Sequence, residues 1–599
     1  MCGFVTQICL NQTRPNKNKV ASMLKLIKHR GPDSTNLKVY DRVCLGFNRL
    51  SILDLSKAAN QPMNDETGRF SIVYNGELYN FKTLQKILKL KGYTFFTASD
   101  TEVLLKSYIE WGEKCLSMFE GMFAFCIYDK QTKEVFIARD QLGIKPLYYY
   151  KSQSTIFFVS EIKALINVIS LKLNYNKIGE YFRYGYIADE STLFKNVNKI
   201  PPGYFMKVFK NGNILKKKYF DIKDSFSEQS NNIDLKNIET KVNQSILDHT
   251  VSDVGFNIQL SGGLDSSYIT AVLRSKLEKK VNTYSIVVDF EKENEEKYQS
   301  LVAKKFNTNH YPVHVSHNDY ADLLEKATWH MDLPILHAGC PFLMHLTKFS
   351  RKTSKVILTG EGADELFGGY SRYKLTMLQK IAYYLKKINL SKDFIPSYIP
   401  KLRGIKKIME MDIGVDDHII NRDISKFLLK TKYKNNFKRN YLKNIDPWIK
   451  KIFLNDQRFY LSTLLERQDK MSMAYSVESR VPFSNITLFK VLNKINSRKK
   501  VEPSLKYLLK KISSKYFSES FINRRKNGFR LPIDKWIRKK GKMNQMLSLL
   551  TDQTFSERGL FKKKEINKMI DDHMSEKENN TKELFSILKF EIWHRLFID

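Results

Sequence analysis

The sequence predicts an α+β domain at the N-terminus, followed by an α/β domain that is built on a parallel sheet and ends in a helical part. Three observations support this fold class. Residues 1 to about 205 mix short strand patterns with a few helices, strand and helix patterns alternate from about residue 240, and amphipathic helices dominate from Leu375 onward. At roughly 150 residues per domain, the 599 residues correspond to two to four domains.

The N-terminal part contains hairpins. Phe70–Tyr74 is a predicted strand that should end at the turn signal Asn75-Gly76, and the strands Phe123–Tyr128 and Glu134–Ala138 flank a polar connection. Two helices are predicted from their apolar faces, which are formed by Phe81, Leu84, Ile87 and Leu88 and by Leu104, Tyr108 and Trp111. Helices grouped with hairpins are typical of a layered α+β domain.

The C-terminal part contains parallel strands. Helical stretches separate the predicted strands Gly255–Leu260, Asn282–Val288, His310–Val315 and Lys355–Leu358. Such alternation predicts βαβ units, since parallel strands need long crossover connections. The last helix carries an apolar stripe of Phe585, Leu588, Ile592, Leu596 and Phe597, so we expect the C-terminus to be packed.

Composition excludes several classes of protein. Hydrophobic residues make up 42% of the chain, enough for folded cores. The six cysteines form no CxxC pair, which argues against a disulfide framework or a structural zinc site and favours a reducing compartment. The start of the chain does not resemble a signal peptide, and no apolar run approaches the ~18 residues of a membrane span. We therefore expect a cytoplasmic protein without a membrane partner.

The charge of +37 arises from 100 Lys and Arg against 63 Asp and Glu. Such an excess can indicate a polyanionic partner. Here the lysines are spread along the chain in short clusters, without a basic tail or an aromatic RNA-binding signature. We interpret them as solvated surface and expect no nucleic-acid partner.

Cys2 is the first candidate nucleophile. Removal of Met1 would leave a cysteine with a free α-amine, whose pKa of roughly 8 allows it to accept the thiol proton. One residue would then supply both nucleophile and base. A second-position cysteine by itself is weak evidence, and taken alone it favours a small buried hydrophobic residue.

The neighbouring motifs favour the catalytic interpretation. Cys2-Gly3-Phe4 is followed in order by Arg30–Asp33, Arg49–Ile52, Tyr74–Glu77, Ser99–Glu102, Arg139–Tyr148 and Ser160–Leu165. Together they resemble the glutamine amidotransferase domain of the N-terminal-nucleophile type, which implies a layered αββα fold and a glutaminase activity.

The predicted glutamine site has three parts. Arg49 is the candidate for the α-carboxylate, because a guanidinium forms a two-pronged hydrogen bond with a carboxylate. Asp100 and the Asn75-Gly76-Glu77 turn are candidates for the α-ammonium. Asn75 and the backbone N–H of Gly76 can stabilise the oxyanion that forms when Cys2 attacks the side-chain amide. The resemblance assigns these residues the same roles.

A second set of motifs predicts a phosphate site. Leu260, Ser261, Gly262, Gly263, Asp265 and Ser266 belong to a glycine-rich loop between a strand and a helix, where free N–H groups can bind phosphate. The string Ser-Gly-Gly-Leu-Asp-Ser resembles the pyrophosphate-binding loop of ATP pyrophosphatases.

A later loop, Thr359–Tyr370, also follows a strand, so both loops should lie at the carboxyl edge of the sheet. Asp265 and Asp364 could share Mg²⁺ with the phosphates of ATP. Leu260 and Ile286 would line the adenine side, and Thr359 and Gly360 would contribute backbone contacts. By resemblance, Lys506 would neutralise the leaving pyrophosphate.

With Asp469–Phe483, these motifs resemble the glutamine-hydrolysing asparagine synthetase family over nearly the whole chain. The resemblance implies that ATP converts aspartate to β-aspartyl-AMP, and that ammonia released at Cys2 crosses an internal tunnel to attack it. Glu361 is the family's residue for steering this attack. The resemblance places an amidotransferase domain at 2–210, a linker at 211–238 and an ATP-pyrophosphatase domain at 239–599, and it suggests a homodimer.

Several positions depart from the family pattern. Leu333 and Asn485 stand where the family has acids, Ser484 replaces a leucine, and Asn294 replaces a frequent aspartate. These departures leave open a related enzyme that amidates another carboxylate, such as a sugar uronate. A third possibility is a basic binding protein on an inactive synthetase scaffold.

Overall fold

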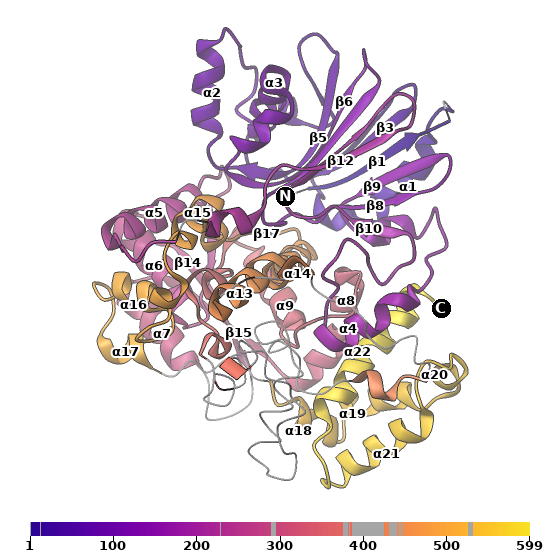
Figure 1. The fold of residues 1–599 in the computed structure, drawn as a ribbon, viewed down its shortest axis with the longest axis vertical. Helices are drawn as coiled ribbons and strands as arrows, with labels where there is room; N and C mark the ends of the chain where they lie inside the picture. The colour runs from indigo at the N-terminus through magenta and orange to yellow at the C-terminus, as the bar shows by residue number, and fades with distance from the viewer. Residues whose placement is uncertain are drawn as a thin grey trace.

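The computed structural model describes residues 2–11, 13–227, 229–288, 295–374, 381, 384–385, 424–429, 440–442, 445, 447–524 and 531–599. Figure 1 shows two halves, with the sheets of the N-terminal half above a C-terminal half that is rich in helices. None of the helices in this described part of the chain combines the length and the apolar character needed to cross a membrane.

The N-terminal half is a four-layer αββα structure. Two antiparallel six-stranded sheets pack face to face through residues such as Phe4, Phe47, Val73 and Ile137. The first sheet has the order β10-β8-β9-β1-β3-β2, with β10 (Val197–Lys199), β8 (Tyr148–Lys151), β9 (Thr155–Val159), β1 (Gly3–Cys9), β3 (Val43–Arg49) and β2 (Ser34–Val39). The second has the order β12-β11-β7-β6-β5-β4, with β12 (Ile214–Lys218), β11 (Tyr204–Val208), β7 (Glu134–Arg139), β6 (Gly121–Asp129), β5 (Phe70–Leu78) and β4 (Met63–Asn64).

Helices cover the outer faces of both sheets. On the first sheet, α1 (Lys17–Leu26) packs through Val20 and Leu24, and α4 (Ile178–Tyr184) follows in the same core. On the second, α2 (Phe81–Leu90) and α3 (Asp100–Trp111) bury their apolar faces. Ile87 was predicted on the buried face of α2, but it is 37% exposed. That prediction is wrong because Leu84 and Leu88 already define the face that meets the sheet.

The predicted turn at Asn75-Gly76 is also wrong. Strand β5 continues through both residues to Leu78, and Asn75 and Gly76 pair with Ala124 and Phe123 of β6. A Cβ at Gly76 would lie 2.1 Å from the carbonyl oxygen of Met122, so the glycine permits close approach of the strands and not a turn.

The C-terminal half is built on a five-stranded parallel sheet with the order β15-β14-β13-β16-β17. Its strands are β15 (Asn309–Val315), β14 (Asn282–Val288), β13 (Asn257–Gln259), β16 (Val356–Leu358) and β17 (Glu478–Arg480). The helices before the last strand are α5 (Leu235–Asp248), α6 (Leu264–Lys276), α7 (Glu296–Lys305), α8 (His317–Met331), α9 (Cys340–Ser350), α10 (Ala363–Phe367), α13 (Trp448–Asn455) and α14 (Leu461–Met473). The predicted fold class, an αββα layer structure joined to a parallel α/β domain, is confirmed.

Helices dominate the end of the chain, as predicted. They are α15 (Ile486–Asn493), α16 (Tyr507–Ser513), α17 (Glu519–Asn523), α18 (Ile533–Arg538), α19 (Lys542–Gln545), α20 (Gln553–Glu557), α21 (Lys563–Met574) and α22 (Thr581–Phe597). In α22, Phe585, Leu588, Ile592 and Phe597 are buried, so the C-terminal helix is packed. Most of residues 375–447 lies outside the described residues. The segment 211–238, predicted as a linker, contains β12 and the start of α5, and the domain boundaries stay a prediction.

Buried ion pairs join the two halves. Asp332, at the end of α8, contacts Lys163 of the N-terminal half at 2.7 Å and Lys470 at 3.0 Å. Arg30 contacts Asp469 of α14 at 2.8 Å. All five side chains are at most 2% exposed, so removing either member of a pair would leave a buried charge uncompensated.

Candidate functional site

Cys2 lies directly before β1 and is held from several sides. Its backbone N–H donates to Asn75 Oδ1 at 2.9 Å, and its carbonyl accepts from Arg30 Nε at 3.0 Å. The N–H of Leu50 points at the Sγ atom at 3.4 Å. Burial raises the pKa of the Cys2 thiol, while the Leu50 N–H and the charge of Arg49 act in the opposite direction. The thiol is thus fixed next to groups that favour its thiolate form.

Asn75 offers an unused donor beside Cys2. Its side chain is fully buried, and its Nδ2 atom has no hydrogen-bond partner among the described residues. A buried unpaired donor costs about 1–3 kcal/mol unless a ligand satisfies it. The next residue, Gly76, lines the cavity that opens beside Cys2. This arrangement fits the predicted oxyanion site.

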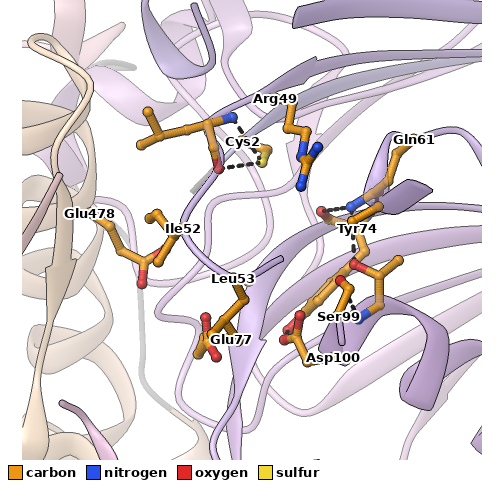
Figure 2. A pocket seen from close by; sticks show the side chains of 14 residues that line it. Cys2, Arg49, Ile52, Leu53, Gln61, Tyr74, Glu77, Ser99, Asp100 and Glu478 are labelled. Atoms are coloured by element: carbon orange, nitrogen blue, oxygen red, sulfur yellow. Dashed lines mark hydrogen bonds between the residues drawn. The ribbon is translucent and has the colours of Figure 1, made fainter. Parts of the chain in front are cut away.

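A cavity that is partly open to solvent lies next to Cys2. Figure 2 shows Arg49 on one side of it and Glu77 and Asp100 on another. Hydrogen bonds to Ser56 and Asn60, at 2.7 and 2.8 Å, hold the Arg49 guanidinium in place. Of the sequence-predicted residues, Cys2, Arg49, Gly76, Glu77 and Asp100 line this cavity, and Asn75 contacts Cys2 beside it. The cavity is also lined by residues to which the sequence analysis assigned no role: Leu50, Ile52, Leu53, Ala59, Gln61, Tyr74, Ser99, Thr101 and Glu478.

The two acidic groups of this cavity are strongly buried. Burial raises the pKa of Asp100 to about 6, although the Leu78 N–H and the Tyr74 hydroxyl each donate to its Oδ2 at 2.9 Å. Burial and the neighbouring Asp100 raise the pKa of Glu77 well above its ordinary value, against the opposing charge of Arg480. A bound ammonium group would favour the ionised forms of both.

The C-terminal half contributes directly to this site. Glu478, on β17, lines the cavity, and Figure 2 shows it on the ribbon facing the N-terminal domain. Arg480, two residues further, contacts Glu77 Oε2 at 3.1 Å. The sequence analysis quoted this segment without assigning these roles. The pattern of charged residues in the short segment between Val477 and Val481 could have indicated them, because buried charges need partners.

The glycine-rich loop lies between β13 and α6, as predicted. The Ser266 hydroxyl accepts from the Ser261 N–H at 3.1 Å, and Gly262 adopts a left-handed conformation with φ +79°. Gly263 precedes the first turn of α6, so the loop leads into free N–H groups at a helix start. Leu260 is fully buried at the end of the strand. Ile286 is part of the adjacent strand β14.

The second loop touches the first. Strands β13 and β16 are neighbours, and a Cβ at Gly360 would lie 2.8 Å from the Cβ of Asp265. Lys506 contacts Asp265 Oδ1 at 2.5 Å and Asp364 Oδ1 at 2.7 Å. Thr359, at the start of the loop, donates its N–H to the Arg480 carbonyl at 2.9 Å. Two carboxylates and one ammonium from distant parts of the sequence therefore meet at the carboxyl edge of the sheet.

Two arginines at this edge were not predicted. Arg467 of α14 forms an ion pair with Glu361. Arg524 donates to the Gly262 carbonyl at 2.6 Å and to Glu295 at 2.8 Å. No sequence pattern distinguishes either from a surface arginine, because both partners are remote in the sequence.

The residues at this edge are compatible with Mg²⁺ bound together with phosphate. Among the described residues, no group of three or more His, Cys, Asp or Glu side chains could hold a metal ion alone. Mg²⁺ is commonly held by one or two carboxylates plus substrate phosphates, and Asp265 and Asp364 supply two carboxylates beside the phosphate loop.

Two of the departures from the family pattern, Asn485 and Ser484, have structural explanations. Asn485 caps α15, because its Oδ1 accepts from the Thr487 N–H at 2.8 Å, and asparagine and aspartate cap helices about equally well. Ser484 packs on the Glu361-Gly362 loop, and its hydroxyl donates to the Glu361 carbonyl at 3.4 Å. Leu333 lines a separate apolar cavity with Tyr181. Asn294 lies outside the described residues.

Comparison with known proteins identifies the families that match the two halves of the chain. The glutamine amidotransferase domain family matches residues 1–220, and the asparagine synthase family matches residues 237–595. The chain is 32% identical to asparagine synthetase [glutamine-hydrolyzing] 1 of Bacillus subtilis, over 100% of this chain and 97% of that protein. It is 31% identical to asparagine synthetase [glutamine-hydrolyzing] 3 of the same organism, over 81% and 79%. The chain therefore belongs to the glutamine-hydrolysing asparagine synthetase family.

Proposed function

We propose that this enzyme makes asparagine from aspartate, with glutamine as nitrogen donor and ATP as the activating substrate. The products would be asparagine, glutamate, AMP and pyrophosphate. Family membership favours aspartate over a sugar uronate as the acceptor. It also favours an active enzyme over an inactive binding protein. The helix-capping role of Asn485 supports aspartate as well, because this departure has an explanation that does not involve the acceptor.

In the N-terminal half, Cys2 attacks the side-chain carbonyl of glutamine. Arg49 binds the α-carboxylate, and Glu77 and Asp100 bind the α-ammonium. The Asn75 Nδ2 group and the Gly76 N–H donate to the oxyanion, which then expels ammonia and leaves a thioester for water to cleave. The α-amine of Cys2 exchanges protons with the thiol and the leaving group once Met1 has been removed.

In the C-terminal half, a β-carboxylate oxygen of aspartate attacks the α-phosphorus of ATP and releases pyrophosphate. The Ser261–Ser266 loop binds the phosphates with Thr359 and Gly360, while Leu260 and Ile286 contact the adenine. Lys506 stabilises charge on the pyrophosphate. Asp265 and Asp364 would hold Mg²⁺, which would neutralise phosphate charge. Ammonia then attacks the acyl-adenylate, with Glu361 accepting its proton, and AMP leaves.

One observation supports this coupled reaction most directly: strand β17 contacts both sites. Strand β17 contributes Glu478 to the Cys2 cavity, while the Arg480 carbonyl accepts from Thr359 of the ATP loop. Ammonia formed at Cys2 would therefore be released against the synthetase half. We also propose a homodimeric, cytoplasmic enzyme without a nucleic-acid partner, organised as domains 2–210 and 239–599.

The test is pyrophosphate release from Mg-ATP and glutamine, with and without aspartate, followed by mass analysis of the products. We expect release that depends on aspartate, with one asparagine per pyrophosphate. Glutaminase activity without aspartate-dependent pyrophosphate would refute aspartate as the acceptor and leave the amidotransferase half of the proposal intact. A uronate in place of aspartate serves as the comparison substrate.

A further inference from the structure

The glutamine site depends on an arginine from the other half of the molecule. Arg480, on β17, is completely buried and makes four side-chain contacts: Glu478 Oε1 at 2.6 Å, Glu77 Oε2 at 3.1 Å, and the carbonyls of His249 and Val251 at 3.0 and 2.5 Å. These fixed partners orient the guanidinium. A buried arginine with this many partners has little freedom to move.

The contact leaves Glu77 with one oxygen for a ligand. Oε2 faces Arg480, whereas Oε1 is buried and has no hydrogen-bond partner among the described residues. Glu77 lines the cavity next to Cys2. An ammonium group is the ligand that a buried carboxylate oxygen favours most, because the hydrogen bond carries charge on both sides.

Charge supports the same conclusion. Glu77 is 2% exposed and lies near Asp100, and both effects favour its protonated form. The Arg480 guanidinium opposes them and favours the carboxylate. A neutral Glu77 would lose most of its attraction for an ammonium group.

We propose that Arg480 is a positioning residue for glutamine binding: it orients Glu77 so that the free oxygen meets the α-ammonium of glutamine. A residue of the synthetase sheet thereby helps to determine how tightly the other half binds glutamine. The inference rests on the proposed glutamine site and adds a residue to it.

Arg480→Lys is the principal variant, since lysine keeps the charge but cannot form the same fork of contacts. We expect KM for glutamine to rise about 10- to 100-fold, the range for a lost charge-assisted hydrogen bond, with kcat changed much less. Ammonium-dependent asparagine synthesis bypasses the pocket and should stay within about twofold, which also reports on folding.

Glutaramate, which is glutamine without its α-amino group, separates positioning from general damage. Hydrolysis of glutaramate should be slow in the unmodified enzyme and in the Arg480→Lys variant. The two rates should differ by less than about twofold, because glutaramate has no ammonium group to contact Glu77. An equal loss with glutamine, glutaramate and ammonium would show that Arg480 is merely structural and would overturn the inference.

Glu77 variants complete the test. Glu77→Gln should raise KM for glutamine, and Arg480→Lys should add little in that background. If Arg480→Lys does not fold, Glu77→Asp is the alternative test variant, because the shorter aspartate side chain cannot contact Arg480 and the ammonium group at the same time. A KM for Glu77→Asp near that of the unmodified enzyme would overturn the inference. A KM for glutamine that rises with Glu77→Gln but not with Arg480→Lys would also overturn it. If neither Glu77→Gln nor Cys2→Ala changes glutamine-dependent turnover, the proposed glutamine site itself is refuted.

Discussion

Replacing Asn75 with alanine tests the oxyanion site. Asn75 is fully buried, and among the described residues its side chain makes one hydrogen bond, from the Cys2 N–H to Oδ1, while its Nδ2 group has no partner there. Loss of that bond leaves the buried Cys2 N–H without its acceptor, which should destabilise the fold by about 1–3 kcal/mol. Loss of a preorganised oxyanion donor typically reduces kcat by about 10²–10³, or about 2.7–4 kcal/mol. The catalytic effect should therefore exceed the effect on stability.

The assay is glutamate release from glutamine, with ammonium-dependent asparagine synthesis measured on the same protein. We expect kcat for glutamine to fall by about 10²–10³ with KM nearly unchanged, since the donor acts mainly on the transition state. Asn48→Ala is the matched control: Asn48 is also fully buried in this half, but its side chain forms hydrogen bonds with the Leu24 carbonyl at 2.8 Å and the Thr35 hydroxyl at 2.8 Å, and not with Cys2. A fall of less than about tenfold, or an equal loss with Asn48→Ala, would refute the assignment of Asn75.

Four further predictions concern the remaining residues. Cys2→Ala should abolish glutamine-dependent turnover and spare turnover with added ammonium; equal loss of both would contradict a two-site enzyme. Asp265→Ala should remove aspartate-dependent pyrophosphate release with either nitrogen source, and unchanged release would mean that the phosphate site lies elsewhere. Because burial raises the pKa of Asp100 to about 6, kcat/KM for glutaminase should fall below that pH, where acidification protonates this group. The Asp100→Asn variant should have a low kcat/KM at every pH and a flatter pH profile. Asn485→Ala should lower the free energy of unfolding by about 1 kcal/mol in denaturant titrations without changing KM for aspartate, and Asn485→Asp should be nearly neutral; a raised KM would return this position to the acceptor site.

Local chemistry accounts for what the sequence predicted well. The string from Ser261 to Ser266 needs a strand before it and a helix after it, and the structure has both in β13 and α6. The strand alternation beyond residue 240 identified the parallel sheet, because the period of a pattern reflects how a strand or a helix is buried. The turn predicted at Asn75-Gly76 was wrong, because this dipeptide is a common turn signal but here the glycine permits close strand pairing.

The fold class, the family resemblance and the residues expected at two sites could therefore be predicted from the sequence. How those sites are connected depends on the packing of the two halves. Arg480 and Glu77 are 403 positions apart and Arg30 and Asp469 are 439 positions apart, and no local pattern encodes such pairs. The same holds for Asn485, whose role as a helix cap depends on where α15 begins. Periodicity and motifs record how each segment meets its immediate surroundings, while the pairing of distant charges is fixed only when the two halves pack and exclude water between them.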